Sequence, residues 1–123
     1  MRYMCLLYLE EGAVPAPGTP AWDEVVRDNV AATGAMRQAG VLVDSGPLQP
    51  VRTATTLRIR DGETLLTDGP FAEVKEQLGG YYLLECEDLD EALRWAATIP
   101  AAKVGSVEVR PVMPRPAAVG GDR

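Results

Sequence analysis

The sequence predicts an α+β fold, a ferredoxin-like βαββαβ domain with an inserted β-hairpin. Two stretches with helical spacing of apolar residues alternate with β-prone runs, and the pair Asp61-Gly62 between two such runs is typical of a tight hairpin turn. The chain has 123 residues, of which 46% are hydrophobic, so one packed core is expected. We therefore expect a single domain over residues 1–113 and a flexible tail over residues 114–123.

The first half of the chain predicts strand, helix and strand. Residues 2–9 are rich in Tyr and Leu, and the glycines and prolines after them predict an irregular loop. Thr19 and Pro20 form a helix-start signal, and Gly40 suits the position just past the end of that helix. Residues 41–48 then predict a second strand.

The second half predicts a hairpin, a strand, a helix and a last strand. Gly79-Gly80 indicates a bulge or a close backbone approach at the start of a strand. Asp88 as N-cap with Glu91 three residues later makes a capping box, and Pro100 is expected to stop that helix. The expected elements are strands over residues 55–60 and 63–67, a polar connector over 71–78, a strand over 81–86, a helix over 88–99 and a strand over 104–113.

Each of the last two strands has one apolar face and one mixed face, because side chains alternate along a strand. The helices would cover the apolar side of the sheet. A mixed face with apolar patches is costly to leave in water, so we expect a second copy to pack against it and form a homodimer. Polar residues between the two sheets would line a cavity for a small ligand. The mixed faces comprise Tyr81, Leu83, Glu85, Ser106, Glu108 and Arg110.

The composition excludes several classes of protein. Lys+Arg number 12 and Asp+Glu 18, and the net charge of -6 argues against a nucleic-acid partner. The chain has no histidine, which excludes His-based acid–base catalysis, Ser-His-Asp and Cys-His systems and His-ligated zinc. The apolar residues 4–9 are too short for a signal-peptide core or a membrane span. Cys5 and Cys86 form no CxxC pair, so we expect two buried thiols in a cytoplasmic protein.

The run TDGPFAEVKEQLGGYY over residues 67–82 resembles the DGPF-type branch of the YCII-related (YciI-like) family. The resemblance covers residues 1–113 and implies a dimeric ferredoxin-like α/β-barrel fold. The other segments that match the family are residues 1–4, 54–58, 88–92 and 105–112.

The resemblance implies less about function. Family members with a His-Asp pair are proposed enzymes, and one relative is a dehydrochlorinase of a chlorinated hydroxyquinol-type compound. This chain has no histidine, so the His-Asp pair is absent here. DGPF-type members are also associated with extracytoplasmic-function sigma factors through gene neighbourhood, which implies a transcription-related role.

Asp68 and Lys75 are the candidate catalytic residues. Asp68 precedes Gly69-Pro70 at the end of a strand, where its carboxylate either accepts backbone N–H groups of an Asx-turn or serves as a general base in a pocket. Lys75 belongs either to a solvated polar connector or to the site. In the site, its ammonium would neutralise Asp68 or hold an anionic substrate.

The candidate ligand-binding residues are Phe71, Glu73, Tyr81, Glu108 and Arg110. Phe71 and Glu73 belong to the DGPF run, and Glu73 is alternatively a solvated surface charge. Glu108 and Arg110 form either an interfacial ion pair or, through the guanidinium, a bidentate site for a carboxylate or enolate. Tyr81 either packs its ring against neighbouring side chains or donates a hydrogen bond from its phenolic hydroxyl.

These observations predict a cytoplasmic homodimer that binds a small anionic or aromatic metabolite in a cavity between sheets. An enzymatic role would be cofactor-free proton transfer, as a lyase or isomerase, with Asp68 as base and Lys75 or Arg110 stabilising negative charge. The alternative is a non-catalytic regulatory or protein-interaction module linked to sigma-factor-dependent transcription. We expect no cofactor, no metal site, and neither nucleic acid nor membrane as a partner.

Overall fold

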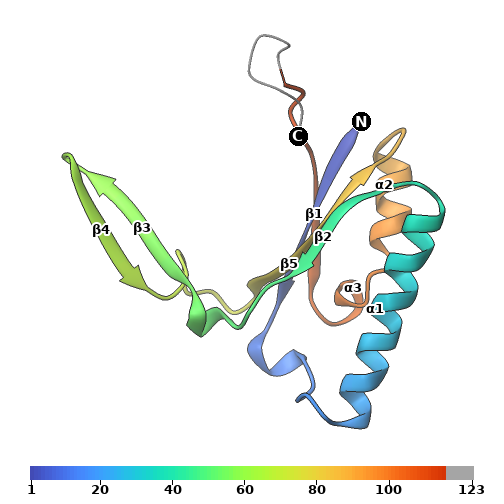
Figure 1. Cartoon of the computed structure of the whole chain (residues 1–123), viewed down its shortest axis with the longest axis horizontal. Coiled ribbons are helices and arrows are strands. Elements are labelled where there is room, and N and C mark those ends of the chain that lie inside the picture. The colour runs from blue at the N-terminus through green and yellow to red at the C-terminus, as the bar shows by residue number, and fades with distance from the viewer. Residues whose placement is uncertain (116–123) are drawn as a thin grey trace.

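A computed structural model describes residues 1–115 of the chain, which form a four-stranded antiparallel sheet with helices against one face and a separate two-stranded hairpin (Figure 1). The strands of the main sheet lie in the order β2-β5-β1-β6. This α+β arrangement is compatible with the predicted ferredoxin-like fold. The strands of the main sheet are β1 (Arg2–Leu9), β2 (Leu42–Pro47), β5 (Gln77–Glu85) and β6 (Ser106–Pro111). The helices are α1 (Pro20–Gln38), α2 (Leu89–Ala96) and α3 (Ala101–Val104), with short 3-10 turns η1 (Glu11–Ala13) and η2 (Val51–Thr53).

The core lies between the sheet and the helices. Alternate residues of β1 and β5 point into it, and its larger, fully buried side chains are Met36, Leu84, Ile99 and Cys5. Ala92 and Ala96 are the buried residues of α2, and their small side chains let that helix lie close to the sheet. Both cysteines are buried free thiols, as predicted. None of the helices within residues 1–115 is long and apolar enough to cross a membrane.

The predicted helix signals are confirmed at α1. The Thr19 hydroxyl accepts a hydrogen bond from the Trp22 amide at 3.2 Å, and Pro20 is the first helical residue. Gly40 follows the helix with a φ of 76°, a left-handed conformation that favours glycine.

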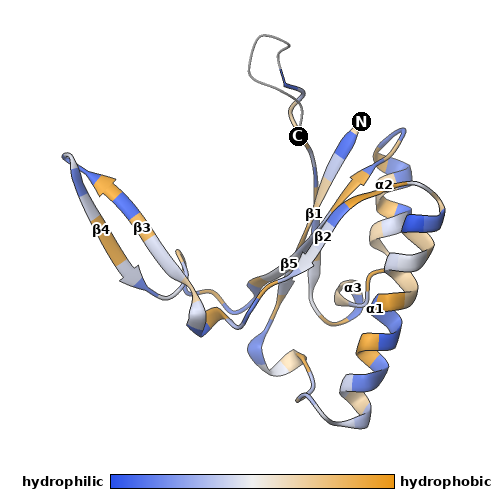
Figure 2. Ribbon diagram, in the orientation of Figure 1, coloured by the Kyte–Doolittle hydropathy of each residue, from blue (hydrophilic) through white to orange (hydrophobic). Residues whose placement is uncertain are grey.

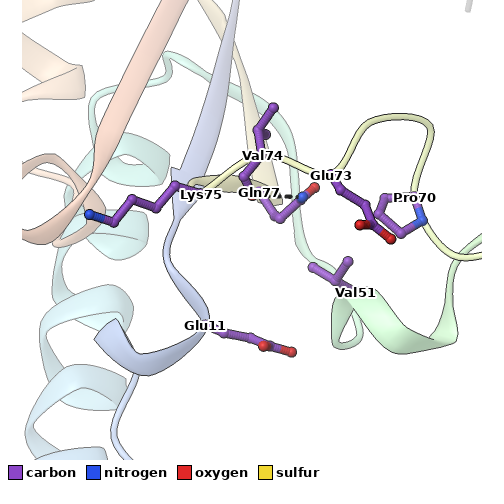
Figure 3. Close-up of a pocket in the computed structure, with 7 residues that line it drawn as sticks. All are labelled: Glu11, Val51, Pro70, Glu73, Val74, Lys75 and Gln77. Carbon is purple, nitrogen blue, oxygen red and sulfur yellow. Dashed lines mark hydrogen bonds between the residues drawn. The ribbon is translucent and has the colours of Figure 1, made fainter.

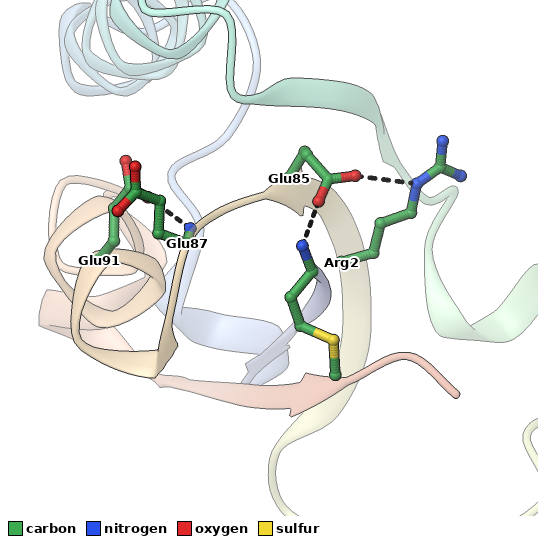
Figure 4. Close-up of polar contacts among 5 residues, drawn as sticks. Arg2, Glu85, Glu87 and Glu91 are labelled. Carbon is green, nitrogen blue, oxygen red and sulfur yellow. Dashed lines mark hydrogen bonds and ion pairs between the residues drawn. The ribbon is translucent and has the colours of Figure 1, made fainter. Parts of the chain in front are cut away.

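The second predicted helix is interrupted. Asp88 caps α2 by accepting from the Glu91 amide at 2.9 Å, and the Glu91 carboxylate accepts from the Glu87 amide (Figure 4). Residues 88–99 were expected to form one helix that Pro100 stops, but α2 ends at Ala96 and Pro100 precedes the short helix α3. The first N–H groups of a helix have no partner within the helix, so proline, which lacks an N–H, is well suited to the start of α3.

Two predicted strand boundaries are also wrong. Strand β5 starts at Gln77 instead of residue 81, because Gly79 and Gly80 lie inside the sheet. Gly79 occupies a bulge opposite Leu7 and Tyr8, as the glycine pair indicated. Strand β6 begins at Ser106 instead of residue 104, since residues 101–104 form α3. The predicted tail over residues 114–123 lies largely outside the described residues.

The predicted hairpin is confirmed and stands apart from the main sheet. Its strands are β3 (Thr55–Arg60) and β4 (Glu63–Asp68), joined by Asp61 and Gly62 with φ values of 51° and 79°. We call this hairpin the arm. It extends away on the side of the sheet opposite the helices (Figure 1). Every residue of β4 is exposed.

Candidate functional site

The structure divides the predicted site residues into two groups. Tyr81, Glu108 and Arg110 lie on the face of the main sheet that the helices leave uncovered, which we call the open face. Asp68 ends the arm, and the connector with Phe71, Glu73 and Lys75 runs from the base of the arm to β5. One copy of the chain therefore does not bring all seven residues to one place.

The open face has an apolar centre with polar groups on both sides. Four partly buried side chains form the centre: Met4, Leu6, Tyr8 and Leu83. In the strand register, Leu6 lies between Tyr81 and Glu108, while Met4 lies between Leu83 and Arg110. Directly opposed residues of antiparallel strands share a face, so these side chains are neighbours. An apolar surface flanked by polar groups is typical of small-molecule sites once it is covered.

On one side of this centre, Tyr81 pairs with Asp44. The Tyr81 hydroxyl donates to Asp44 Oδ2 at 3.0 Å, and Asp44 Oδ1 accepts from the Ser45 amide at 2.8 Å. The Tyr81 ring lies against Gly46, where a Cβ atom would be 3.0 Å from the ring. The hydrogen bond to Asp44 raises the pKa of Tyr81, with smaller contributions from desolvation and the Asp44 charge. The phenol is therefore held as a neutral donor.

Sequence reasoning missed Asp44. Alternation within β2 alone does not show which residue of β5 it meets, because the register shifts between Leu42 and Asp44. Only the pairing of β2 with β5 places Asp44 beside Tyr81.

On the other side, Arg110 and Glu108 form an ion pair within the chain. Arg110 Nε donates to Glu108 Oε2 at 2.8 Å, and Nη2 contacts the same oxygen. Both predicted alternatives for these residues, an ion pair at a subunit interface and a guanidinium site for a ligand, stay predictions. The Arg110 side chain is 67% exposed, so the guanidinium is accessible to a ligand.

At the edge of the open face, the amino terminus neutralises Glu85. The Met1 ammonium contacts Glu85 Oε2, and Arg2 Nε lies 3.5 Å from Oε1 (Figure 4). The hydrogen bond from the terminal ammonium is the main cause that lowers the pKa of Glu85, and Arg2 lowers it further. Burial opposes this shift only in part.

The base of the arm holds Asp68 on a tight turn. The Gly69 amide donates to the Ala54 carbonyl at 2.7 Å, and the Thr56 hydroxyl donates to the Gly69 carbonyl at 2.9 Å. Gly69 has a φ of 106°, which a residue with a side chain rarely adopts. The turn therefore fixes where β4 ends and where Asp68 lies.

Phe71 and Lys75 each have a partner that the sequence did not indicate. The Arg58 guanidinium lies 5.2 Å from the centre of the Phe71 ring, a cation–π contact. Lys75 Nζ lies 3.6 Å from Glu10 Oε1 and points away from Glu73 (Figure 3). Lys75 thus pairs with Glu10 instead of Asp68, and its role as a catalytic residue stays a prediction.

A groove of about 670 Å³ lies between the base of the arm and the sheet. Its walls are mostly apolar and come from the end of β1, the segment around η2, the DGPF turn and the start of β5. The connector beside it is held by Gln77, whose amide donates to the carbonyls of Ala72 and Val74 at 3.0 and 2.9 Å. Tyr8 lines the groove and also belongs to the open face, so the two surfaces are continuous.

Within residues 1–115, no three His, Cys, Asp or Glu side chains are grouped to hold a metal ion. The carboxylate, phenol and guanidinium groups on these surfaces can form hydrogen bonds and charge pairs, and the carboxylates and phenol can also transfer protons.

Two comparisons with known proteins bear on these residues. The family model of the YCII-related domain matches residues 1–115. A Rhizobium meliloti (strain 1021) protein described as uncharacterized protein R00369 is 43% identical over 114 residues, which cover 91% of this chain and 92% of the relative. The matched range contains both the open face and the arm.

Proposed function

The chain belongs to the YCII-related domain family, and on that basis we propose that it is a homodimer that binds a small anionic or aromatic metabolite between two facing sheets. The run over residues 67–82 supports its placement in the DGPF-type branch. The buried free thiols support a cytoplasmic location.

The composition of the open face is the observation that supports this proposal. The helices of residues 1–115 lie on the opposite side of the sheet, so none of them covers Met4, Leu6 or Leu83 (Figure 1). A second copy packed face to face would remove them from water and enclose the polar pairs beside them. Enclosed polar groups in an apolar cavity are the usual anchors for a small ligand.

The polar pairs define the chemistry of the ligand. Arg110 offers charged donors that suit a carboxylate or an enolate. The Tyr81 hydroxyl donates its one proton to Asp44, so its oxygen offers an acceptor to an O–H or N–H group of a ligand. These residues lie on β6 and β5, with β1 between them, so about 10 Å separates the two strands. An aromatic ring over the apolar centre with an acidic group at one end fits this spacing.

The catalytic part of the proposal is cofactor-free proton transfer of the isomerisation or elimination type. Asp68 acts as the base, and Arg110 or Lys75 stabilises the negative charge that develops. Asp68 and Arg110 belong to different surfaces of one chain, so this chemistry requires that Asp68 of one copy meets the open face of the other.

A ligand screen tests the binding proposal. We expect a set of small aromatic carboxylates, phenols and quinones to contain a compound that raises the Tm of the wild-type protein. At about one hundred times its Kd, such a ligand adds about 2.7 kcal/mol. Arg110→Gln should lose the shift, while Lys103→Gln on α3 serves as a matched control and should keep it. A dimeric protein that no compound stabilises would overturn the proposal.

A second function is favoured by a different observation. The exposed apolar side chains of the arm also suit a non-catalytic regulatory module that holds another protein, such as a sigma factor. A purified wild-type protein that stays monomeric, together with a stable complex between it and a purified sigma factor, would favour this alternative.

A further inference from the structure

The two faces of the arm differ in character. In the register of β3 and β4, Leu57 lies opposite Leu66, Ile59 opposite Thr64, and Thr55 opposite Asp68. Opposed residues share a face, so one face of the arm carries three large apolar side chains and ends in Asp68. We call it the apolar arm face. The other face carries Arg58, Arg60, Glu63 and Leu65.

The apolar arm face is strongly exposed. Leu57 is 59% exposed, Ile59 60% and Leu66 66%. The arm forms a sheet of its own, and Figure 2 shows hydrophobic stretches on both of its strands. A lone two-stranded hairpin is marginally stable in water and gains its stability from packing. Within residues 1–115, no segment buries these three side chains, so this face is suited to a further contact.

We propose that the cover is the open face of a second copy, so that the arm of each copy closes the ligand cavity of the other. This inference rests on the proposed dimer and adds the residues that complete its site. The arm brings Asp68 along with the apolar side chains, because all of them share one face. Each cavity then combines Tyr81 and Arg110 of one copy with Asp68 of the other.

The area of the apolar arm face fits this role. A Leu or Ile side chain has on the order of 100 Å² of apolar surface. The exposed fractions of Leu57, Ile59 and Leu66 leave about 180 Å² per arm. Both arms and the matching surface on their partners give about 700 Å², and a specific interface needs about 1,000 Å². The facing sheets supply the remainder.

The oligomeric state of two matched variants tests the inference. Leu66→Asp places a charge on the apolar arm face, and Leu65→Asp places the same charge on the neighbouring residue of the opposite face. We expect the wild type and Leu65→Asp to be dimers by light scattering after size exclusion. Leu66→Asp should raise the dimer Kd about a hundred-fold and run as a monomer at micromolar concentration. Far-UV circular dichroism checks that each variant is folded.

The other outcomes separate the two proposals. A wild-type dimer that Leu66→Asp leaves intact overturns the role of the arm, while the dimer itself stands. A monomeric wild type overturns both and leaves the apolar arm face to another protein. Loss of the dimer in both variants overturns the assignment of the dimer contact to the apolar arm face alone.

Photocrosslinking identifies the partner surface without a destabilising charge. A variant that carries a benzophenone amino acid in place of Leu66 is made with ¹⁴N. It is mixed with ¹⁵N-labelled wild-type protein, and the mixture is irradiated. We expect crosslinked peptides of mixed label that join the arm to residues 1–10 or 77–86. Crosslinks confined to peptides of one label, or joined to α1 or α2, would contradict the inference.

Discussion

Replacing Gly105 with alanine is expected to destabilise the protein strongly, because the backbone leaves no room for a side chain. Gly105 lies between α3 and β6. A Cβ atom there would be 2.1 Å from the Tyr8 carbonyl oxygen and 3.0 Å from Leu9 Cδ2. Tyr8 pairs with Ser106 in the β1–β6 ladder, so its carbonyl cannot retreat without disturbing that ladder.

The size of the effect follows from this distance. Ordinary contacts of a Cβ atom begin at about 3.4 Å, so the two backbone segments must separate by about 1 Å. Overpacking typically costs about 1–3 kcal/mol, and a clash with backbone in a rigid sheet lies at or above the upper end of that range. We therefore expect a loss of about 3 kcal/mol in the free energy of unfolding. The shift would also displace the start of the strand that carries Glu108 and Arg110.

Urea denaturation followed by circular dichroism measures this loss, with Gly34→Ala as the matched control. Gly34 lies on the exposed side of α1, and a Cβ atom there would meet nothing within 4 Å. Alanine is the better helix former, so the control should gain about 0.5–1 kcal/mol. A loss of less than about 1 kcal/mol in Gly105→Ala would refute the reasoning from close contact.

Three further predictions concern titration and reactivity. By NMR, the Tyr81 hydroxyl should titrate above the usual range for tyrosine, and Asp44→Asn should lower its pKa; an unchanged pKa in the variant would contradict this. The hydrogen bond to Asp44 stabilises the fold fully below the pKa of Tyr81 in the unfolded chain, and this stabilisation is lost as pH rises through its pKa in the folded protein. The Glu85 carboxyl should titrate below its usual range, and acetylation of the amino terminus should raise its pKa; equal titration of the acetylated and unacetylated proteins would argue against the pair. The small stabilisation from this pair is present above the pKa of Glu85 in the unfolded chain and is lost as pH falls through its pKa in the folded protein. Burial raises the pKa of Cys5 to about 11, so a thiol reagent at pH 8 should modify it only after unfolding in urea, and rapid native labelling would contradict its burial.

Local signals in the sequence correctly predicted most elements. Asp61-Gly62 determined the turn of the hairpin because both positions adopt positive φ, which few residue pairs tolerate. Thr19 and Asp88 determined two helix starts through hydrogen bonds to amides three residues ahead. Such interactions depend only on near neighbours in the chain, so they can be read without knowing the fold.

Boundary errors arose where long-range packing overrides a local signal. Gly79 and Gly80 favour a loop by propensity, yet both lie within β5. At Gly80, a Cβ atom would be 3.1 Å from the Gly46 carbonyl oxygen of β2, so the close approach of two strands accounts for the glycine. Pro100 is ambiguous in a similar way, because a proline that is expected to stop one helix can also stand at the start of the next.

The sequence by itself determined which side chains share a strand face. Alternation placed Glu108 with Arg110, and separated both from Val107 and Val109, because the period of a strand is two whatever its neighbours are. It also determined the net charge and the absence of histidine, which limit the chemistry.

Only the tertiary structure decided which faces meet. Tyr81 meets Asp44 across 37 positions of sequence, and Lys75 meets Glu10, because β5 lies between β2 and β1. The arm standing away from the sheet is likewise a result of strand pairing, since β3 and β4 pair only with each other among the described strands. Strand order depends on the free energy of the whole core and not on any short segment, so no local pattern specifies it.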